Sequence, residues 1–552
     1  PVFRRLAATT AEKGGPALRI AIASDHAGFN LKQLLLTRLA GEPDLSFIDL
    51  GTSAATPPVD YPDFAKSAAT AVVHGDADRG IVICGSGAGA CIAASKVRGT
   101  RAFLAGETYT AHQAVEHDDA NILCLGERVT GPELAVEIAR TFVRAQFSDQ
   151  ERHRRRVGKI MAIEAESNFP IEALLRQGQS VWMDNIARSM LISGELRRLA
   201  WHDRVAGMTS NPTIFEKAMA NGPEYEAPAR ELAEQGKSAE EIYWALAIED
   251  IQGAADTLRP IYELTGGGDG YVSLENPPSV ADDTQATIEM TRELWRRLDR
   301  PNVMIKIPAT PEGVPAIETS IASGINVNVT LMFSVALYEE VAHAYIKGLE
   351  RFFSGREPLR MRHPRSLQAA PVSVASFFVS RVDTLVDKLL GEKIAAASGD
   401  TARLEGLLGK AAIANARLAY KRFLEIFAGP AWQALANQGA QVQRPLWAST
   451  STKNPRYRDV LYVEELVGPN TVDTMPPATL EAFKDHGRVA RTVDTPDALA
   501  RAAQTMTDLA KVGVDMDAVT LELQRDGVKL FADSFDQLIA RLEERRRALA
   551  AV

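Results

Sequence analysis

The sequence predicts an α/β protein with two domains, a doubly wound parallel sheet followed by a (β/α)8 barrel. Three observations predict this fold class. The chain has 552 residues, more than one ordinary hydrophobic core contains. Short apolar runs alternate with amphipathic helical patterns along most of the chain. The composition, with 46% hydrophobic and 24% charged residues, is typical of a soluble globular enzyme.

The smaller domain is expected in the first third of the chain. Residues 1–17 contain basic residues but no apolar segment, which predicts a flexible tail rather than a secretory signal. Five apolar runs, separated by amphipathic helices, predict strands at 18–24, 45–50, 80–85, 101–106 and 121–126. Five such strands in about 150 residues are typical of one doubly wound, Rossmann-like sheet. We place this domain at 18–167 and a linker at 168–173, because Pro170 should stop the charged helix before it.

The second domain is expected to span residues 174–548. Its eight candidate strands lie at 181–184, 204–207, 271–275, 303–307, 325–330, 371–376, 444–449 and 470–474. Eight strands with helices between them predict a closed barrel with helical insertions. The chemistry of such barrels lies at the C-terminal ends of the strands. Six polar residues lie at or next to those predicted ends: Asp184, Glu275, Lys306, Thr330, Ser376 and Ser449.

Charge and cysteine content restrict the partners and the compartment. The net charge is −9 and the isoelectric point is near 5.7, so there is no overall basic field to bind nucleic acid or an anionic membrane. No uncharged stretch is long enough to span a bilayer. The three cysteines, Cys84, Cys91 and Cys124, form neither a disulfide framework nor a CxxC motif, which predicts a reducing cytoplasm. We therefore expect a cytoplasmic enzyme that acts on small molecules.

A glycine-rich turn, CGSGAG at 84–89, follows a predicted buried strand and opens a helix. Glycines allow a tight turn and leave backbone N–H groups that can face an anion at the start of the helix. A thiol at this position, that of Cys84, is suited to proton transfer. The alternative is a turn that only packs, with Cys84 as a small buried apolar residue like Cys91 and Cys124. The turn alone leaves both interpretations open.

Other motifs extend this pattern from Leu18 to Glu166. DHAG, DYP, ICGSGAG, EHDDAN, LGER and RHRRRV together resemble the ribose-5-phosphate isomerase B family, part of a group that includes isomerases of allose and galactose 6-phosphates. The resemblance implies that Cys84 moves a proton between C1 and C2 through a cis-enediol, and that His117 opens the sugar ring. It also implies a homodimer, because members of this family build the site across a dimer interface.

The resemblance implies roles for further residues of this half. The anion hole would be formed by Gly85, Ser86, Gly87, Ala88 and Gly89, with Ser86 also assisting catalysis. Asp25 would hold a ring hydroxyl. The phosphate would be surrounded by His26, Arg128, Arg152 and Arg156. Without the resemblance, the helix that carries Arg152 and Arg156 is interpreted as a solvated cationic face.

Two positions bear on the activity of this half. Some members use a glutamate after the glycine turn, where this chain has Ala90, so Cys84 has no competitor as the base. The residue after the ring-opening histidine is usually asparagine, and here it is Asp118. A carboxylate next to a developing enediolate repels it unless the carboxylate is protonated or turned away. Asp118 therefore supports an alternative, a non-catalytic dimerisation or sugar-phosphate-sensing module, or one specific for allose or galactose 6-phosphate.

The barrel half contains a lysine within an apolar strand, Lys306 in VMIKIP. Desolvation favours the neutral form of an amine, which is the form that adds to a carbonyl group. The alternative is a lysine whose ammonium reaches solvent at the strand end. Polar residues at the same predicted mouth favour the first interpretation. They are the carboxyl groups of Asp184 and Glu275, the hydrogen-bonding groups of Asn211, Asn328, Thr330 and Ser376, and the cations Arg381 and Lys453.

The motifs TSNPTIF, VSLE, IKIPAT, NVNVTLMFS and ASFFVSRVD resemble transaldolase from about Leu174 to Leu542, and WASTSTKNP resembles its larger bacterial form. The resemblance implies that Lys306 forms an imine with a ketose phosphate. Glu275 and Thr330 would position the catalytic water, and Asp184 would be the acid/base at the C4 hydroxyl. Asn211 and Asn328 would hold the dihydroxyacetone unit. The phosphate would be held by Ser376 and Arg381, with Lys453 where shorter forms carry an arginine.

Two rival chemistries are less well supported. A metal-dependent aldolase needs clustered histidines, whereas His202, His343, His363 and His486 are scattered, so we expect no metal and no organic cofactor. Fructose-6-phosphate aldolase relatives are much shorter and carry glutamine where Glu275 stands. We therefore expect a fusion of two enzymes of the non-oxidative pentose phosphate branch. One interconverts ribose 5-phosphate and ribulose 5-phosphate, and the other transfers dihydroxyacetone from sedoheptulose 7-phosphate to glyceraldehyde 3-phosphate.

Overall fold

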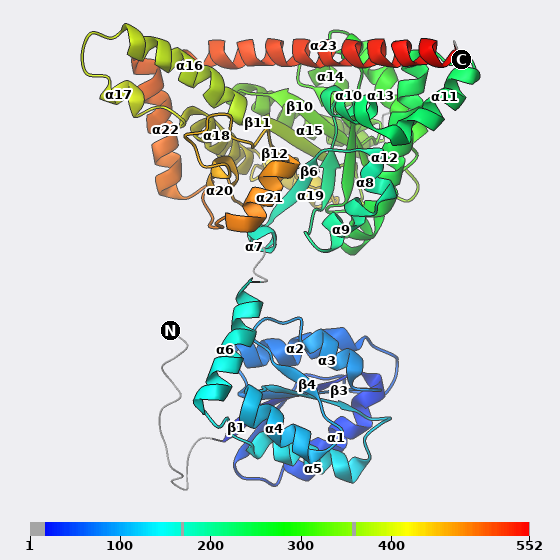
Figure 1. Cartoon of the computed structure of the whole chain (residues 1–552), viewed down its shortest axis with the longest axis vertical. Helices are drawn as coiled ribbons and strands as arrows, with labels where there is room; N and C mark the ends of the chain where they lie inside the picture. Colours follow the sequence, from blue (N-terminus) through cyan, green and yellow to red (C-terminus); the bar gives the residue numbers. More distant parts are fainter. Residues whose placement is uncertain (1–16, 167–169, 356–359, 551–552) are drawn as a thin grey trace. The chain divides into compact units, whose positions relative to one another are not determined.

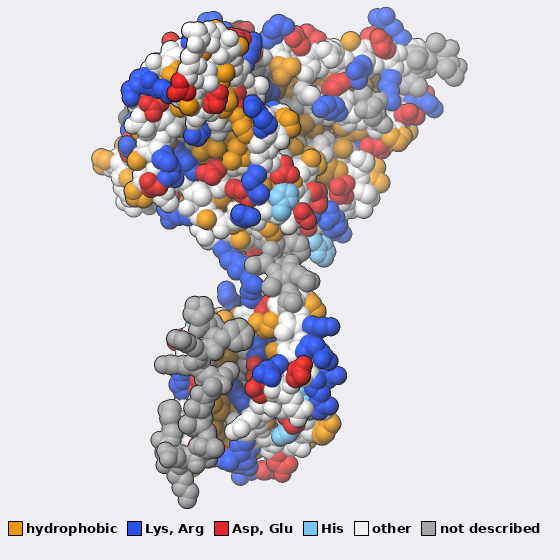
Figure 2. Space-filling view, turned by 60° about the vertical axis from the view of Figure 1, so that its left-hand side comes forward, with side chains coloured by type: hydrophobic (Ala, Val, Ile, Leu, Met, Phe, Trp, Pro, Cys, Tyr) orange, Lys and Arg blue, Asp and Glu red, His pale blue; other side chains and the backbone are white. Residues whose placement is uncertain are grey.

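The computed structural model describes residues 17–166, 170–355 and 360–550. The chain divides into two compact units between residues 168 and 169 (Figure 1). The expected N-terminal tail lies, except for residue 17, outside the described residues. Acidic and basic side chains are interspersed over the visible face of the larger unit (Figure 2). Among the residues the structure describes, no helix is long and apolar enough to cross a membrane.

The N-terminal unit is built on a five-stranded parallel sheet in the order β2-β1-β3-β5-β4, which confirms the predicted fold. The strands are β1 (Leu18–Ser24), β2 (Leu45–Asp49), β3 (Arg79–Cys84), β4 (Ala102–Leu104) and β5 (Ile122–Gly126). The helices are α1 (Phe29–Leu39), α2 (Tyr61–His74), α3 (Ala88–Ala94), α4 (Thr108–Asp118), α5 (Pro132–Arg144) and α6 (Glu151–Glu166).

Helices cover both faces of this sheet because each central strand is apolar on both sides. Isoleucines and leucines of β1, β3 and β5 pack against α1, α4 and α5. Alternate residues of the same strands, such as Ala23 and Val82, pack against alanines of α2 and α3. Pairing of Ser24 with Ile83 and of Cys84 with Gly126 places three strand ends at one edge of the sheet. Several predicted site residues of this half, such as Asp25 and Gly85, directly follow these strand ends in the sequence.

The second unit is the predicted closed barrel, in the order β10-β11-β12-β13-β6-β7-β8-β9, with β13 pairing with β6 to close it. The strands are β6 (Gln179–Asp184), β7 (Gly207–Thr209), β8 (Tyr271–Glu275), β9 (Val303–Pro308), β10 (Val327–Met332), β11 (Ser373–Phe378), β12 (Arg444–Ala448) and β13 (Thr471–Met475). All neighbouring strands are parallel, so their C-terminal ends meet at one mouth.

Helices surround the barrel and form the insertions between its strands. They are α7 (Pro170–Arg176), α8 (Arg188–Ile192), α9 (Glu195–Trp201), α10 (Pro212–Asn221), α11 (Glu226–Glu234), α12 (Ala239–Leu264), α13 (Thr284–Leu298), α14 (Gly313–Ala322), α15 (Val335–Ser354), α16 (Ser380–Ala396), α17 (Ala402–Glu405), α18 (Ala411–Ile426), α19 (Pro430–Ala436), α20 (Leu461–Glu465), α21 (Pro477–His486), α22 (Pro496–Lys511) and α23 (Met516–Ala550). Figure 1 shows α23 as one long helix across an end of this unit.

Most barrel strands begin and end within two residues of the predicted bounds, and β7 departs further. The strand predicted at 204–207 begins at Gly207 and runs to Thr209. Arg204 has a φ of 58°, a left-handed conformation that belongs to a turn rather than a strand. A Cβ on Gly207 would lie 2.5 Å from the Trp182 ring, so the strand can start there only with a glycine. The shift brings Thr209 to the barrel mouth.

The predicted linker and barrel end also differ from the structure. Residues 170–173 form the first turn of α7, because proline is well tolerated at the start of a helix, where no intrahelical N–H bond is needed. Ile171 and Leu174 of this helix are fully buried in the core of the barrel unit. At the other end, α23 continues two residues past the predicted limit of 548.

Candidate active sites

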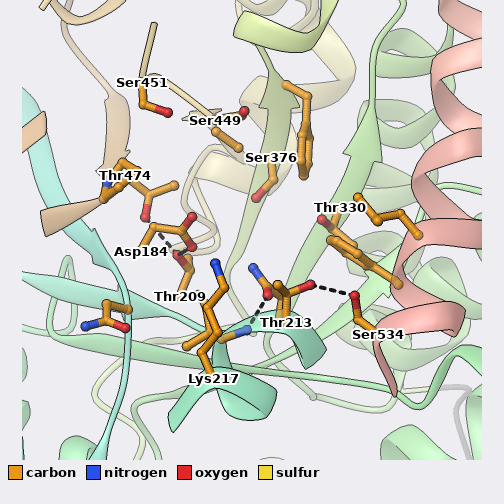
Figure 3. A pocket seen from close by; sticks show the side chains of 18 of the residues that line it. Asp184, Thr209, Thr213, Lys217, Thr330, Ser376, Ser449, Ser451, Thr474 and Ser534 are labelled. Atoms are coloured by element: carbon orange, nitrogen blue, oxygen red, sulfur yellow. Dashed lines mark hydrogen bonds between the residues drawn. The ribbon is translucent and has the colours of Figure 1, made fainter. Parts of the chain in front are cut away.

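The barrel mouth contains a cavity of about 610 Å³ (Figure 3). Its walls come from the ends of seven strands and from α10, α16 and α23. Seven of the predicted site residues line this cavity, together with the strand-end residue Ser449: Asp184, Asn211, Lys306, Thr330, Ser376, Arg381 and Lys453. The barrel therefore gathers side chains that are up to 269 residues apart in the sequence, from Asp184 to Lys453, around one space.

Lys306 lies on β9 and is buried, with its amine at the cavity. Its Nζ donates to the backbone oxygen of Ser210 at 3.0 Å and to Glu275 Oε2 at 3.3 Å. Glu275 is its partner in the β8–β9 register, so two adjacent strands fix this ion pair. The Phe531 ring of α23 lies 6.0 Å from Nζ. The amine is thus held in place, shielded by an aromatic ring and open to a ligand on the cavity side.

Two carboxyl groups accompany the lysine. Burial raises the pKa of Asp184, while Lys306 and a hydrogen bond from Thr209 oppose that rise. The Thr209 hydroxyl donates to Asp184 Oδ1 at 2.7 Å. Burial likewise raises the pKa of Glu275, and Lys306 again opposes it. A raised pKa makes each carboxylate a stronger base, which is what proton transfer to and from a substrate hydroxyl requires.

The hydroxyl and amide groups have different roles. Thr330 Oγ1 is buried without a hydrogen-bond partner in the described part of the chain, and it lines the cavity. A buried hydroxyl without a partner is suited to bind water or substrate. Asn211 lines the cavity while its Oδ1 accepts from the Ile214 N–H at 3.0 Å, which caps α10. Asn211 is thus held rigidly by the helix that it caps.

Two predicted residues do not line the cavity. Glu275 lies behind Lys306, and Asn328 lies behind Ser376. The Asn328 amide donates to Ser273 Oγ at 3.0 Å and accepts from Ser376 Oγ at 2.7 Å. Both polar ends of Asn328 are therefore bonded to the protein. These two hydrogen bonds hold Asn328 in place and support Ser376, and the predicted contact of Asn328 with substrate stays a prediction.

Cations gather on one side of the cavity. Arg381, Lys453 and Lys217 line it, and Lys217 is labelled in Figure 3. Burial lowers the pKa of Lys453, and the positive charges of Arg381 and Lys217 lower it further. Burial also lowers the pKa of Arg381, which Asp184 and Glu275 oppose. A cavity lined by three cations is a suitable place for a dianionic phosphate.

Sequence reasoning missed several residues of this site. Thr209 and Ser210 directly precede Asn211 in TSNPTIF, so the motif itself held a signal for them. Lys217 lies two residues after the motif, on the helix that Asn211 caps. Phe531 and Ser534 come from α23, where no motif marks them. The Thr213 hydroxyl donates to Ser534 Oγ at 2.9 Å and attaches α23 to α10 (Figure 3).

In the N-terminal unit, the glycine turn joins β3 to α3. Cys84 ends β3 and is buried, and its Sγ accepts the Gly87 N–H at 3.2 Å. Gly87 has a φ of 79° and directly precedes α3. A Cβ on Gly87 would lie 2.5 Å from Leu104 Cδ1, so both backbone and space require glycine. Cys91, expected to be buried, is only half-buried.

Other residues surround this turn. A Cβ on Gly85 would lie 3.5 Å from Arg128 Cζ, so the guanidinium lies over the turn. The Tyr61 ring lies over Gly89, where a Cβ would come within 2.7 Å of Cζ, and sequence reasoning missed this residue. Asp25 Oδ1 accepts the N–H groups of Ala27 and Gly28, both at 3.0 Å, and so caps the short helix after β1.

The remaining predicted residues have partners outside the turn or are exposed. His26 Nδ1 is 3.1 Å from the Val59 backbone. His117 on α4 stacks on His153 of α6, with ring centroids 4.1 Å apart. Four further residues are exposed: Ser86, which lies in the turn itself, Asp118, Arg152 and Arg156. Within residues 17–166, no hydrogen bond, ion pair or ring contact joins Cys84 to His117.

Comparison with known proteins agrees with this geometry. Residues 181–542 match the family model for Transaldolase/Fructose-6-phosphate aldolase. The chain is 46% identical over 380 residues to Transaldolase 2 of Nostoc sp., covering 68% of this chain and 97% of that protein. The chain belongs to the transaldolase/fructose-6-phosphate aldolase family. A second member of this family, the transaldolase of Thermobifida fusca, is 48% identical over 380 residues, which cover 69% of this chain and 99% of that protein.

The N-terminal unit of this transaldolase-family protein matches a different family. Residues 20–160 match the family model for Ribose/Galactose Isomerase. The solved structure of ribose-5-phosphate isomerase B from Clostridium thermocellum is 48% identical, covering 27% of this chain and 99% of that chain, with a TM-score of 0.26. The type B enzyme of Trypanosoma brucei is 44% identical, covering 27% and 99%, also with a TM-score of 0.26. The two predicted family resemblances are thus confirmed.

Proposed function

We propose that the protein is bifunctional, with a transaldolase at residues 170–550 and a ribose-5-phosphate isomerase at residues 18–166. The observation that carries the first assignment is the buried Lys306 amine, 3.3 Å from Glu275 and facing a cavity with three cations. The names of the relatives that match the barrel support the reaction type. We place the protein in the cytoplasm because its three cysteines are free thiols.

The barrel reaction proceeds through an imine. The Lys306 amine adds to the C2 carbonyl of a ketose phosphate, and water leaves as the imine forms. Asp184 takes the proton of the C4 hydroxyl and the C3–C4 bond breaks. The electron pair of that bond passes into the imine to give an enamine, and an aldose phosphate leaves. The enamine then attacks the carbonyl carbon of glyceraldehyde 3-phosphate, Asp184 returns its proton, and water hydrolyses the new imine.

Residues around the lysine serve binding and hydrolysis in this proposal. Glu275 and Thr330 position the water that hydrolyses the imine. The Thr330 hydroxyl supports that role because it has no hydrogen-bond partner in the described part of the chain. Arg381, Lys453 and Lys217 hold the phosphate, assisted by Ser376. A fructose-6-phosphate aldolase would form the same imine, but its enamine would be protonated and dihydroxyacetone released. Transfer is favoured because Glu275 stands where such aldolases carry glutamine.

Borohydride trapping tests the barrel assignment. Treatment with fructose 6-phosphate and borohydride should reduce the imine and leave a dihydroxyacetone-derived adduct that peptide mapping places on Lys306. The variant Lys306→Arg should lose both adduct and turnover, because a guanidinium stays charged and cannot add to a carbonyl. A borohydride label on Lys453 would overturn the assignment. So would full activity that is abolished by EDTA in a protein that borohydride does not label.

In the N-terminal unit, the Cys84 thiolate takes the C2 proton of the open-chain aldose and returns it at C1, while the enediolate is held by the N–H groups of the glycine turn. The bond from the Gly87 N–H to Sγ supports this role by placing a donor beside the thiol. His117 opens the ring, and Arg128, Arg152 and Arg156 hold the phosphate. Assays with ribose 5-phosphate and with allose 6-phosphate should give turnover mainly with ribose 5-phosphate. Turnover with neither sugar would favour the non-catalytic module.

We further propose that the protein is a homodimer through this unit. Four large apolar side chains are exposed on elements next to the glycine turn: Ile92, Leu104, Tyr109 and Val129. Exposed apolar side chains of this size commonly mark an interface. Light scattering should give the mass of two chains for the wild type. The double variant Tyr109→Asp/Val129→Asp should give the mass of one chain. A wild-type mass of one chain would contradict the dimer.

A further inference from the structure

A second cavity of the barrel unit lies among helices inserted around the barrel rather than at its mouth. It has a volume of about 620 Å³ and is bounded by α17, α18, α20 and α22. No residue lines both this cavity and the one that contains Lys306. The chemistry of the barrel site therefore does not account for its side chains.

The lining of this cavity has an excess of positive charge. Four cationic residues line it, whereas only two acidic ones do: Arg403, Lys410, Arg417, Arg501, Glu465 and Asp508. Arg417 pairs with Glu465, and Arg403 lies 3.6 Å from Asp508. Arg501 pairs with Asp497, which does not line the cavity. No ion pair of the described residues includes Lys410, which is exposed.

Arg417 is the most informative of these cations. Its side chain is only 8% exposed, although burial of a guanidinium is costly without full hydrogen bonding. Its Nη2 donates to Glu465 Oε2 at 2.5 Å and to the Glu465 backbone oxygen at 3.2 Å. Its Nε is buried and has no partner in the described part of the chain. Arg417 lines the cavity, and a buried donor without an acceptor would be stabilised by an anionic or polar partner.

The charges of the cavity also act on one another. Burial lowers the pKa of Arg417, and the positive charge of Arg501 lowers it further. The two guanidiniums therefore lie close enough to repel. An anion bound between them would remove that repulsion and supply the acceptor that Nε lacks.

Part of the cavity lining is apolar and rigid. Leu407, Ile413 and Leu461 contribute aliphatic surface beside the Tyr457 ring. The Tyr457 hydroxyl donates to Asp387 Oδ2 at 2.6 Å, and the Gly409 N–H donates to the other oxygen at 2.9 Å. Gly409 has a φ of 67°, and a Cβ there would lie 2.6 Å from Tyr457 Cζ. The cavity is thus preformed, which lowers the ordering cost of binding.

We propose that this cavity binds a small phosphate-bearing dianion, with the phosphate between Arg417 and Arg501 and the rest of the molecule against the Tyr457 wall. Arginine favours phosphate because its planar fork donates two parallel hydrogen bonds. The net lining charge of two matches a phosphate monoester at neutral pH. The site is additional to the phosphate position of the barrel mouth and does not depend on the reaction proposed there.

Hydrogen exchange of the full chain, read by mass spectrometry with and without inorganic phosphate, tests this site. Phosphate should slow exchange in peptides that cover 403–417 and 501–508. It should separately slow exchange in peptides that contain Arg381, which report on the barrel mouth. Potassium chloride at equal ionic strength should slow neither set. Phosphate protection of the Arg381 peptides alone would overturn the proposal.

Three variants complete the test. Arg417→Met removes the buried donor, and Arg501→Ser removes a side chain that is 61% exposed, so the second variant should fold even if the first does not. Each should raise the phosphate concentration for half-maximal protection of 403–417 by about tenfold. Arg296→Ser is the matched control, since Arg296 is 69% exposed and pairs along its own helix with Glu293. Unchanged protection in Arg501→Ser, or an equal loss in Arg296→Ser, would overturn the proposal.

Discussion

The two proposed active sites of this chain differ in how completely one protein chain encloses them. In the barrel, Lys306 contacts Glu275 directly, and both are buried among strands of one closed sheet. In the N-terminal unit, Cys84 and Asp25 are buried, but four other predicted groups are exposed: Asp118, Arg128, Arg152 and Arg156. A barrel provides the desolvation of its site from its own core. An open sheet edge provides only part of the desolvation that its site needs. We expect the remaining desolvation to come from another surface, such as a second copy of the chain.

The largest effect that would test this comparison is the loss of one activity without the other. Cys84→Ala should lower ribose-5-phosphate isomerisation by about 100- to 10,000-fold, because the thiolate is the proposed base. Transaldolase turnover should stay within about twofold, since Cys84 packs only in the core of its own unit. Both activities would be measured on the same preparation. Isomerase activity within a few-fold of wild type would refute the role of Cys84.

The next effect concerns the order of steps in the barrel. Asp184→Ala should slow transaldolase turnover at least about a hundredfold, because no base remains at the C4 hydroxyl. The borohydride adduct on Lys306 should still form, because imine formation precedes the step that Asp184 serves. Rapid-quench measurement of adduct and product separates the two steps. Loss of the adduct together with turnover would mean that Asp184 also assists imine formation.

A smaller effect should appear in the pH profile of the barrel site. Thr209→Val removes the hydrogen bond that stabilises the ionised form of Asp184, so the pKa of Asp184 should rise further above its ordinary value. Asp184 acts as a base only when ionised, so the acidic limb of transaldolase kcat should move to higher pH. The expected shift is about half to one pH unit. A shift toward lower pH would show that this limb belongs to another group.

The smallest effect is expected at Asp118. Its side chain is exposed at the end of α4, where water screens its charge from a bound enediolate. Asp118→Asn should therefore raise isomerase kcat/KM by less than about threefold, or shift its acidic limb, without abolishing activity. A loss of tenfold, about 1.4 kcal/mol of transition-state stabilisation, would instead give Asp118 a positive role in catalysis or sugar preference.

The sequence predicted the fold well because both sheets are formed by apolar runs with clear ends. It predicted Lys306, Asp184 and Cys84 as strand-end residues, and the structure places each at an end of its strand or near it. It misplaced β7, where Arg204 in a left-handed turn and the Gly207 contact with Trp182 decide the boundary. Such a boundary depends on a residue of another strand. Local patterns do not contain that information.

The parts of the site that the sequence did not predict depend on tertiary contacts. Asn328 has the residue type and position of a substrate ligand, yet its hydrogen bonds to Ser273 and Ser376 use both ends of its amide. Phe531 and Ser534 lie on α23, a helix without a motif, and they reach the cavity only because α23 packs against α10. The second cavity was not predicted either, because Arg417 and Arg501 are ordinary helix residues until α18 and α22 come together.

The position of α23 has a consequence for how the protein is made. During translation the N-terminal unit is complete before β6 leaves the ribosome, whereas the barrel site still lacks Phe531 and Ser534 after β13 has been synthesised. We expect nascent chains of intermediate length to be able to isomerise but not to transfer. A chain interrupted between Met475 and Met516 would keep all eight barrel strands and the Lys306 amine, yet open its cavity to water on the side that α23 closes.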